Sequence, residues 1–103
     1  MRILLDHCTP AKLVPHLAGH VVVTTAGKGW DTLQNGELLL AAEAEFDLFI
    51  TCDGNIRYQQ NLSARRIAIL ELGVQKWPLL QLRLSEICAA VEAISPGEYR
   101  VLF

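Results

Sequence analysis

The sequence has few charged residues and no excess of positive charge. Of its 103 residues, 19% are charged and 51% are hydrophobic, and the net charge is −2. A protein that coats nucleic acid would be basic overall, so this class is excluded, although a local group of arginines can still contact a nucleic-acid substrate. A chain of this length and apolar content buries a core of its own. We therefore expect one folded domain, residues 1–103, and not a disordered chain.

Cysteine is also scarce, and its spacing argues against two common uses. Cys8, Cys52 and Cys88 are odd in number and form no Cys-x-x-Cys pair, so we expect reduced thiols in a cytoplasmic protein and not a disulfide framework. The first apolar run is followed at once by Asp6 and His7, so we expect no signal peptide. No apolar run is long enough to span a bilayer, so no membrane partner is expected.

Apolar, β-branched segments alternate with helix-forming segments along the chain. The run Val21-Val22-Val23 is typical of a buried strand, and the leucines and alanines that follow Asn35 are typical of a helix. Thr9 and Asn35 are expected to cap the first two helices. The pattern predicts strands at 2–5, 20–24, 46–51, 66–72 and 98–103, helices at 11–17, 36–45, 56–61 and 78–94, and loops at 25–34 and 73–77.

This alternation predicts an α/β fold. Strands that are apolar almost throughout and are separated by helices indicate a mainly parallel five-stranded sheet covered on both faces, a three-layer α/β/α sandwich. Right-handed crossovers leave few topologies, and the order 2-1-3-4-5 is favoured, with the direction of the last strand left open. The first and third strands are then neighbours at the point where strand order reverses, which is where such folds bind ligands.

Three acidic residues fall near that point. Asp6 follows the first strand, Asp53 follows the third, and Glu37 lies in the first turn of the helix that begins near Asn35. Carboxylate oxygens suit a hard cation such as Mg²⁺ or Mn²⁺. Asp6, Asp53 and Glu37 are therefore candidate metal ligands, and Glu71, near the end of the fourth strand, is an additional candidate.

Each of these acids also has an ordinary structural interpretation. Asp6 could satisfy backbone N–H groups at the turn that follows it. Glu37 is favoured in the first turn of a helix by the helix dipole. Asp53 precedes Gly54, and this pair is common in turns. A folded domain with no metal site at all therefore stays open as an alternative.

Several short motifs follow one another along nearly the whole chain, and together they resemble the pattern of a known family. The chain resembles the short bacterial PIN-like proteins, a group related to PIN-domain and Mut7-C-type nucleases and often found as the toxin of toxin–antitoxin modules. The motifs are Leu4-Leu5-Asp6, Gly19-His20-Val21-Val22, a Gly-Trp before Asn35-Gly36-Glu37, Ile50-Thr51-x-Asp53-x-Asn55, Tyr58-Gln59-Gln60-Asn61-Leu62, Arg65-Arg66 and Trp77-Pro78.

The resemblance implies a PIN-like fold and an Mg²⁺- or Mn²⁺-dependent ribonuclease. Asp6, Glu37 and Asp53 would form its catalytic, metal-binding cluster, because carboxylate-held divalent ions activate water and neutralise phosphate charge. A protein antitoxin is the implied partner, and a homo-oligomer would suit the apolar composition. Further side chains would support the site: Asn35, Thr51 and Asn55 would hold waters or phosphate oxygens, and Arg57, Arg65 and Arg66 would hold the RNA backbone.

The chain departs from the family pattern at the first strand end. The family usually reads Leu-Leu-Asp-Glu-Asn there, whereas this chain has His7 and Cys8 after Asp6, and Gly54 stands where relatives often have lysine. One alternative is therefore a PIN-like protein that has lost catalysis and binds a partner. A softer metal site at His7, Cys8 and Cys52 is a further alternative.

A receiver domain is an alternative of another class. Asp53 would be its phospho-acceptor at the end of the third strand. A receiver also needs an acidic pair after the first strand and a lysine after the fifth. This chain has only Asp6 at the first place and no residue at the second.

Overall fold

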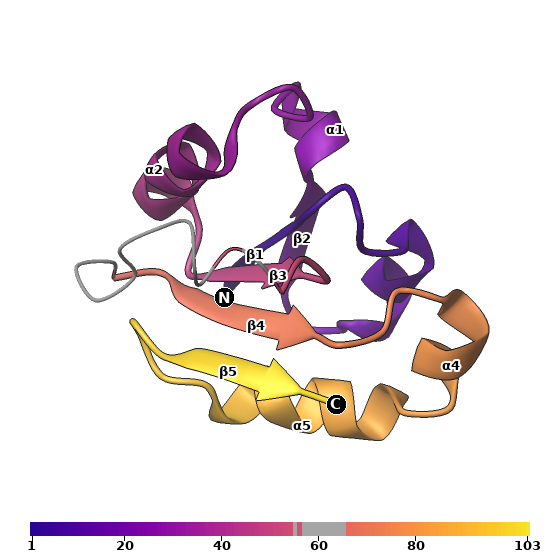
Figure 1. Cartoon of the computed structure of the whole chain (residues 1–103). Coiled ribbons are helices and arrows are strands. Elements are labelled where there is room, and N and C mark those ends of the chain that lie inside the picture. The colour runs from indigo at the N-terminus through magenta and orange to yellow at the C-terminus, as the bar shows by residue number, and fades with distance from the viewer. Residues whose placement is uncertain (55, 57–65) are drawn as a thin grey trace.

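A five-stranded parallel sheet forms the centre of the fold (Figure 1). The computed structural model describes residues 1–54, 56 and 66–103, and of residue 35 the backbone alone. The strand order is β2-β1-β3-β4-β5, and all four strand pairs are parallel. The α/β class and the predicted order are therefore confirmed, and the last strand runs parallel to its neighbour. The strands are β1 (Arg2–Leu5), β2 (Val21–Thr24), β3 (Leu48–Thr51), β4 (Ala68–Leu72) and β5 (Tyr99–Leu102).

The helices differ from the prediction in three places. The segment 11–17 is a 3₁₀ helix, and Pro15 inside it lacks the N–H that an α-helix needs. The predicted loop 25–34 opens with a short helix, which Thr24 caps by accepting a 2.9 Å hydrogen bond from Gly27 N at its Oγ1. The predicted helix 78–94 is two helices, and the predicted helix 56–61 lies outside the described residues except for Ile56. The helices are η1 (Ala11–His16), α1 (Thr25–Lys28), α2 (Asn35–Glu45), α4 (Trp77–Gln81) and α5 (Leu84–Ala93).

Both predicted helix caps are wrong. Thr9 does not cap η1, because its hydroxyl donates instead to Ile50 O, at 3.4 Å, across the neighbouring strand. Pro10 occupies the cap position without a side-chain bond. Asn35 is the first residue of α2, and Gln34 precedes it as the cap residue, again without a side-chain bond.

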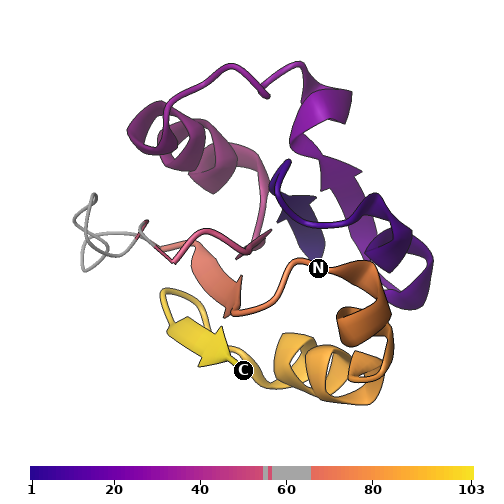
Figure 2. The same ribbon diagram turned by 45° about the vertical axis from the view of Figure 1, so that its right-hand side comes forward.

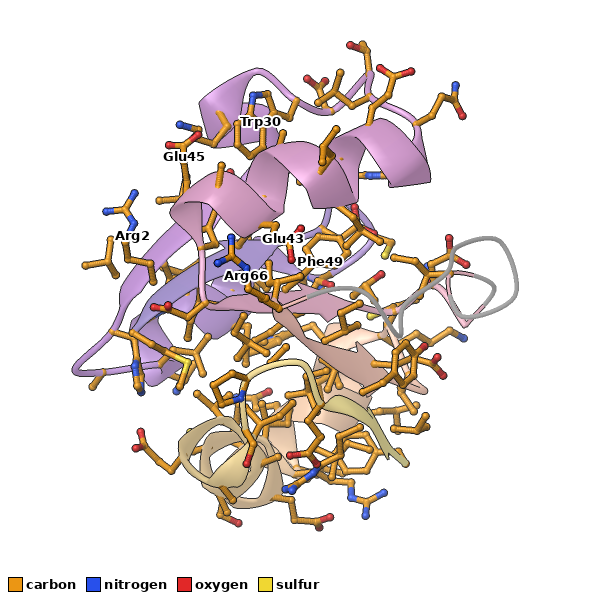
Figure 3. The ribbon with its side chains drawn as sticks, turned by 90° about the vertical axis from the view of Figure 1, so that its left-hand side faces the viewer. Arg2, Trp30, Glu43, Glu45, Phe49 and Arg66 are labelled. Atoms are coloured by element: carbon orange, nitrogen blue, oxygen red, sulfur yellow. The ribbon has the colours of Figure 1, made fainter. Side chains whose placement is uncertain are left out.

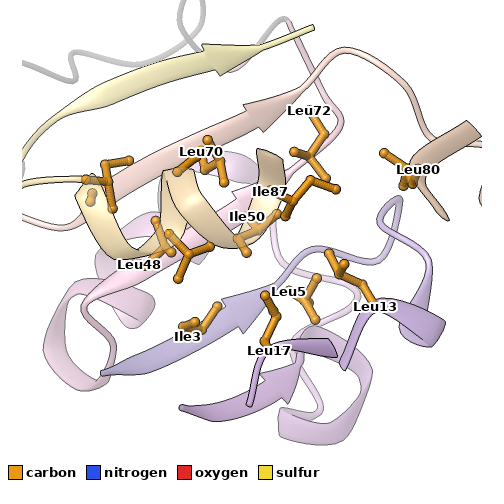
Figure 4. Packing of buried hydrophobic residues seen from close by; sticks show 14 residues of the cluster. Ile3, Leu5, Leu13, Leu17, Leu48, Ile50, Leu70, Leu72, Leu80 and Ile87 are labelled. Carbon is orange, nitrogen blue, oxygen red and sulfur yellow. The ribbon is translucent and has the colours of Figure 1, made fainter. Parts of the chain in front are cut away.

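Two hydrophobic clusters pack against the two faces of the sheet, because successive strand residues point to opposite faces. On one face, η1, α4 and α5 cover the strands, and Leu13, Leu80 and Ile87 pack there (Figure 4). On the other face, α2 packs against Leu4 and Phe49. Figure 2 shows α2 and α5 on opposite sides of the strands. The centre of the sheet is therefore closed to solvent on both faces.

The edges of the sheet are less buried than its centre. Every residue of β3 is buried, whereas the edge strands β2 and β5 expose Val21 and Val101. Among the described residues, no helix is long and apolar enough to cross a membrane. The buried β1–β3 pair fixes the position of the residues that follow it, and these residues form the candidate site.

Candidate functional site

The carboxyl ends of β1 and β3 meet at one edge of the sheet. The register pairs Leu5 with Ile50, and Asp6 continues this pairing because its N–H donates to Ile50 O at 2.9 Å. Asp6 and Asp53 consequently lie in the wall of a single open pocket of about 360 Å³. Its other lining residues are His7, Cys8, Cys52, Gly54 and Gln75.

The Asp6 carboxylate is buried and is hydrogen-bonded at both oxygens. Its side chain is 3% exposed. Oδ1 accepts from His7 N at 2.9 Å and lies 3.0 Å from His7 Nδ1, which donates in the tautomer that carries its proton there. Oδ2 accepts from Thr51 Oγ1 at 2.8 Å and from Cys8 Sγ at 3.3 Å. These donors offset the cost of burying a carboxylate, and a cation would have to displace some of them.

Thr51 joins the two aspartates. Its side chain is fully buried, and while its hydroxyl donates to Asp6 it also accepts a 3.0 Å hydrogen bond from Asp53 N. The sequence predicts that Thr51 supports the metal ligands by holding a water or a phosphate oxygen. The structure places it between Asp6 and Asp53, where it sets their relative position.

Glu37 does not lie with the two aspartates. It is exposed in the first turn of α2 and is absent from the lining of the pocket. Leu38 and Leu39 are buried and set the rotation of the helix against the sheet. Within residues 1–54, 56 and 66–103, no three His, Cys, Asp or Glu side chains are grouped so that they could hold a metal. The predicted cluster of three carboxylates is therefore not assembled here.

The predicted RNA-binding and supporting residues are only partly described. Arg66 precedes β4 at the amino edge of the sheet, where its N–H donates to Glu43 Oε1 (Figure 3). Because a parallel strand rises by about 3.3 Å per residue, Arg66 lies roughly 16 Å along β4 from Glu71 at the opposite edge, beside a different pocket. The backbone of Asn35 begins α2. The predictions for Asn55, Arg57 and Arg65 lie outside the described residues.

A pair of thiols lies beside the two aspartates, and the sequence indicated Cys8 and Cys52 only as members of a softer metal site. Cys52 N donates to Cys8 Sγ at 3.3 Å. Hydrogen bonding by the Cys52 thiol to the Cys8 thiolate lowers the pKa of Cys8 from 9.0 to about 7, against the opposing effect of burial. The same hydrogen bond, with burial, raises the pKa of Cys52. No local pattern marks this pair, because 44 residues separate its members.

Glu71 is a second buried acid near the pocket. It is 5% exposed, is the register partner of Thr51, and accepts a hydrogen bond from Tyr99 OH. A Cβ placed on Gly54 would lie 3.4 Å from Glu71 Oε2, so Glu71 borders the wall of the pocket behind Gly54. In the sequence, Glu71 can be recognised because it is an acidic residue within the otherwise apolar strand β4.

A second pocket adjoins the first. It has a volume of about 340 Å³ and shares Asp6, His7 and Cys8 with its neighbour, while Thr24 and Thr25 form its far side. Thr25 Oγ1 is buried and has no hydrogen-bond partner in the part of the chain that the structure describes. The two pockets together extend from the ends of β1 and β3 to the start of α1, which follows β2.

Comparison of the chain with protein-family models, with curated proteins and with solved structures finds no match. The resemblance to PIN-like proteins therefore stays a prediction. Function at this edge is inferred from Asp6, Asp53 and their neighbours.

Proposed function

We propose that the pocket between Asp6 and Asp53 binds one divalent cation, Mg²⁺ or Mn²⁺, and that the protein is a PIN-like ribonuclease. One observation carries this proposal: two carboxylates from neighbouring strand ends line the same open pocket. Mg²⁺ is commonly held by one or two carboxylates, with water and substrate phosphates completing its shell. Two carboxylates fit one such ion, and they are too few for a pair of ions.

Different residues of the pocket would have different roles in phosphodiester hydrolysis. A bound divalent cation would neutralise phosphate charge and activate a water molecule. Thr51 orients the Asp6 carboxylate and holds the main chain of Asp53, because its hydroxyl donates to Asp6 Oδ2 and accepts from Asp53 N. His7 lines the pocket with an exposed ring whose Nδ1 lies against Asp6. It is the candidate to protonate the leaving oxygen.

A second function is favoured by the bonding of Asp6. Its two oxygens already receive four contacts from within the chain, and Glu37 is exposed outside the pocket. In this alternative the site has lost its metal, and the protein acts by binding a partner such as a protein antitoxin. Leu40 and Leu82 are exposed and are available to such a partner or to a second copy of the chain. The cytoplasm stays the predicted location.

Thermal unfolding with and without millimolar Mn²⁺ or Mg²⁺ tests the metal site. Binding to the native state alone stabilises it by mass action, by about 2.7 kcal/mol at a metal concentration 100 times the Kd. We expect the midpoint to rise for the wild type and not for Asp53→Asn. Asp31→Asn is the matched control, because Asp31 is an exposed acid outside the lining of the pocket. The absence of any shift in the wild type would favour the partner-binding function.

Cleavage of RNA tests the activity itself. We expect metal-dependent cleavage by the wild type that a chelator and Asp53→Asn both abolish. The variant His7→Glu restores the carboxylate that the family pattern has at this position. Cleavage by His7→Glu but not by the wild type would identify a site that has lost its catalysis.

A further inference from the structure

The Cys8 side chain lies against Cys52 at the ends of β1 and β3, and the two cysteines line one pocket. Cys8 Sγ lies 3.3 Å from Cys52 N, so the Cys8 side chain reaches the main chain of Cys52. A disulfide joins cysteines whose Cα atoms lie roughly 4.4–6.8 Å apart, so it needs side chains that can meet. Because the Cys8 sulfur already reaches the main chain of Cys52, rotation of the side chains is enough to bring the two sulfurs together.

Both thiols are open to a small reagent. Each is partly exposed, and both line the pocket that contains Asp6 and Asp53. Cys52 Sγ also donates to Val74 O at 3.4 Å, which steadies it beside Cys8. The remaining thiol, Cys88, lies in α5, donates to His16 O at 3.3 Å and lines a different pocket.

We propose that Cys8 and Cys52 are a modification site, a dithiol that a hydroperoxide converts into a reversible disulfide. Cys8 Sγ attacks the O–O bond of hydrogen peroxide, forms a sulfenic acid and releases water. Cys52 Sγ then attacks the sulfenic sulfur, forms the S–S bond and releases a second water. Two thiols are oxidised in total, one peroxide is reduced, and two hydrogens leave the protein.

The disulfide changes the surroundings of Asp6. In the reduced protein, Cys8 Sγ donates to Asp6 Oδ2 at 3.3 Å. Oxidation removes that hydrogen, so one of the donors to the buried carboxylate is lost, and a covalent bond ties the two strand ends that carry Asp6 and Asp53. The oxidation state of Cys8 and Cys52 therefore controls the hydrogen bonding of Asp6 in this pocket. Its formation does not depend on the proposed nuclease activity.

Oxidation followed by mass spectrometry tests the proposal. The reduced full chain is treated with stoichiometric hydrogen peroxide, quenched with N-ethylmaleimide and weighed intact. We expect a monomer that has lost two hydrogens and takes up one maleimide, at Cys88, where the reduced protein takes up three. Trypsin should release the Cys8 and Cys52 peptides joined, because Lys12 and Lys28 lie between these residues. Dithiothreitol should separate them.

Two cysteine variants show which thiols form the disulfide. Cys88→Ser is the matched control and should form the same bond. Cys52→Ser should form none, and its Cys8 should instead accumulate a sulfenic acid that dimedone captures. Three maleimides on peroxide-treated wild type, or a disulfide that involves Cys88 or a second chain, would overturn the proposal. Since this readout uses the wild type, it holds even if a variant folds poorly, and it is independent of metal binding and RNA cleavage.

Discussion

Thr51 Oγ1 donates a 2.8 Å hydrogen bond to Asp6 Oδ2, across the pair of strands at the centre of the sheet. The contact follows from the register of the two strands. Because Leu5 pairs with Ile50, the residues that come next, Asp6 and Thr51, lie side by side. The same hydroxyl accepts from Asp53 N. One buried side chain therefore couples the two acids of the candidate site.

Replacement of Thr51 by valine should destabilise the protein. Valine keeps the shape of threonine but removes the hydroxyl that donates to Asp6 Oδ2 and accepts from Asp53 N, and we expect a loss of about 1–3 kcal/mol. Urea unfolding followed by circular dichroism would measure the change. Thr51→Ser keeps the hydroxyl and is the control. Equal stability of Thr51→Val and wild type would show that these hydrogen bonds contribute nothing.

The Tyr99–Glu71 contact should also contribute to stability. Glu71 is buried in β4, and Tyr99 OH from β5 donates to it. Tyr99→Phe removes that donor, and we expect a loss of about 1–3 kcal/mol. A double-mutant cycle with Glu71→Gln isolates the pair. A coupling energy near zero in chemical denaturation would contradict this prediction.

The rates of alkylation of Cys8 and Cys52 should depend on pH differently. The Cys52 hydrogen bond lowers the pKa of Cys8 to about 7, below its ordinary 9.0, so Cys8 is mostly thiolate above pH 7. Its rate with iodoacetamide should rise about tenfold per pH unit below pH 7 and level off above it, because the thiolate is the nucleophile. The pKa of Cys52 is raised, so Cys52 should stay slow up to pH 9.

The control for the pH dependence of Cys8 alkylation replaces Cys52, the hydrogen-bond donor to the Cys8 thiolate. In Cys52→Ala the thiolate of Cys8 loses the hydrogen bond that lowers its pKa, so the midpoint of its alkylation curve should move upward. Peptide mapping after timed alkylation, with a chelator present, separates Cys8 from the other thiols. A Cys8 midpoint near 9 in the wild type would contradict the prediction.

The strand order could be predicted because the central strands are apolar at nearly every position. A strand of this kind must be covered on both faces, and right-handed crossovers then allow few arrangements. The same local reasoning failed for the segment 78–94. No proline or glycine lies between Gln81 and Leu84, yet the helix breaks there. Arg83, at the break, places its guanidinium carbon 3.8 Å from the ring centre of Phe103, and no local propensity encodes a contact between residues so far apart in the chain.

Sequence reasoning predicted that Asp6 and Asp53 lie at one edge of the sheet, and they line one pocket there, whereas Glu37, which was predicted to join them, is exposed outside that pocket. Both aspartates follow strands, and the carboxyl ends of parallel strands share one edge, so their common pocket follows from the strand order. Glu37 lies on a helix, where successive residues turn by about 100°. Its direction depends on how Leu38 and Leu39 pack against the sheet, which only the tertiary structure decides.

The sequence by itself thus determined the sheet and the edge at which two acids meet, because both depend on short-range apolar patterning and chain connectivity. Only the tertiary structure decided that Thr51 bonds Asp6 and that Cys8 lies against Cys52. Residues 44 apart carry no local signal of contact. Their distance is set by the β1–β3 register and by the turn after Asp6, and both are consequences of packing the whole chain.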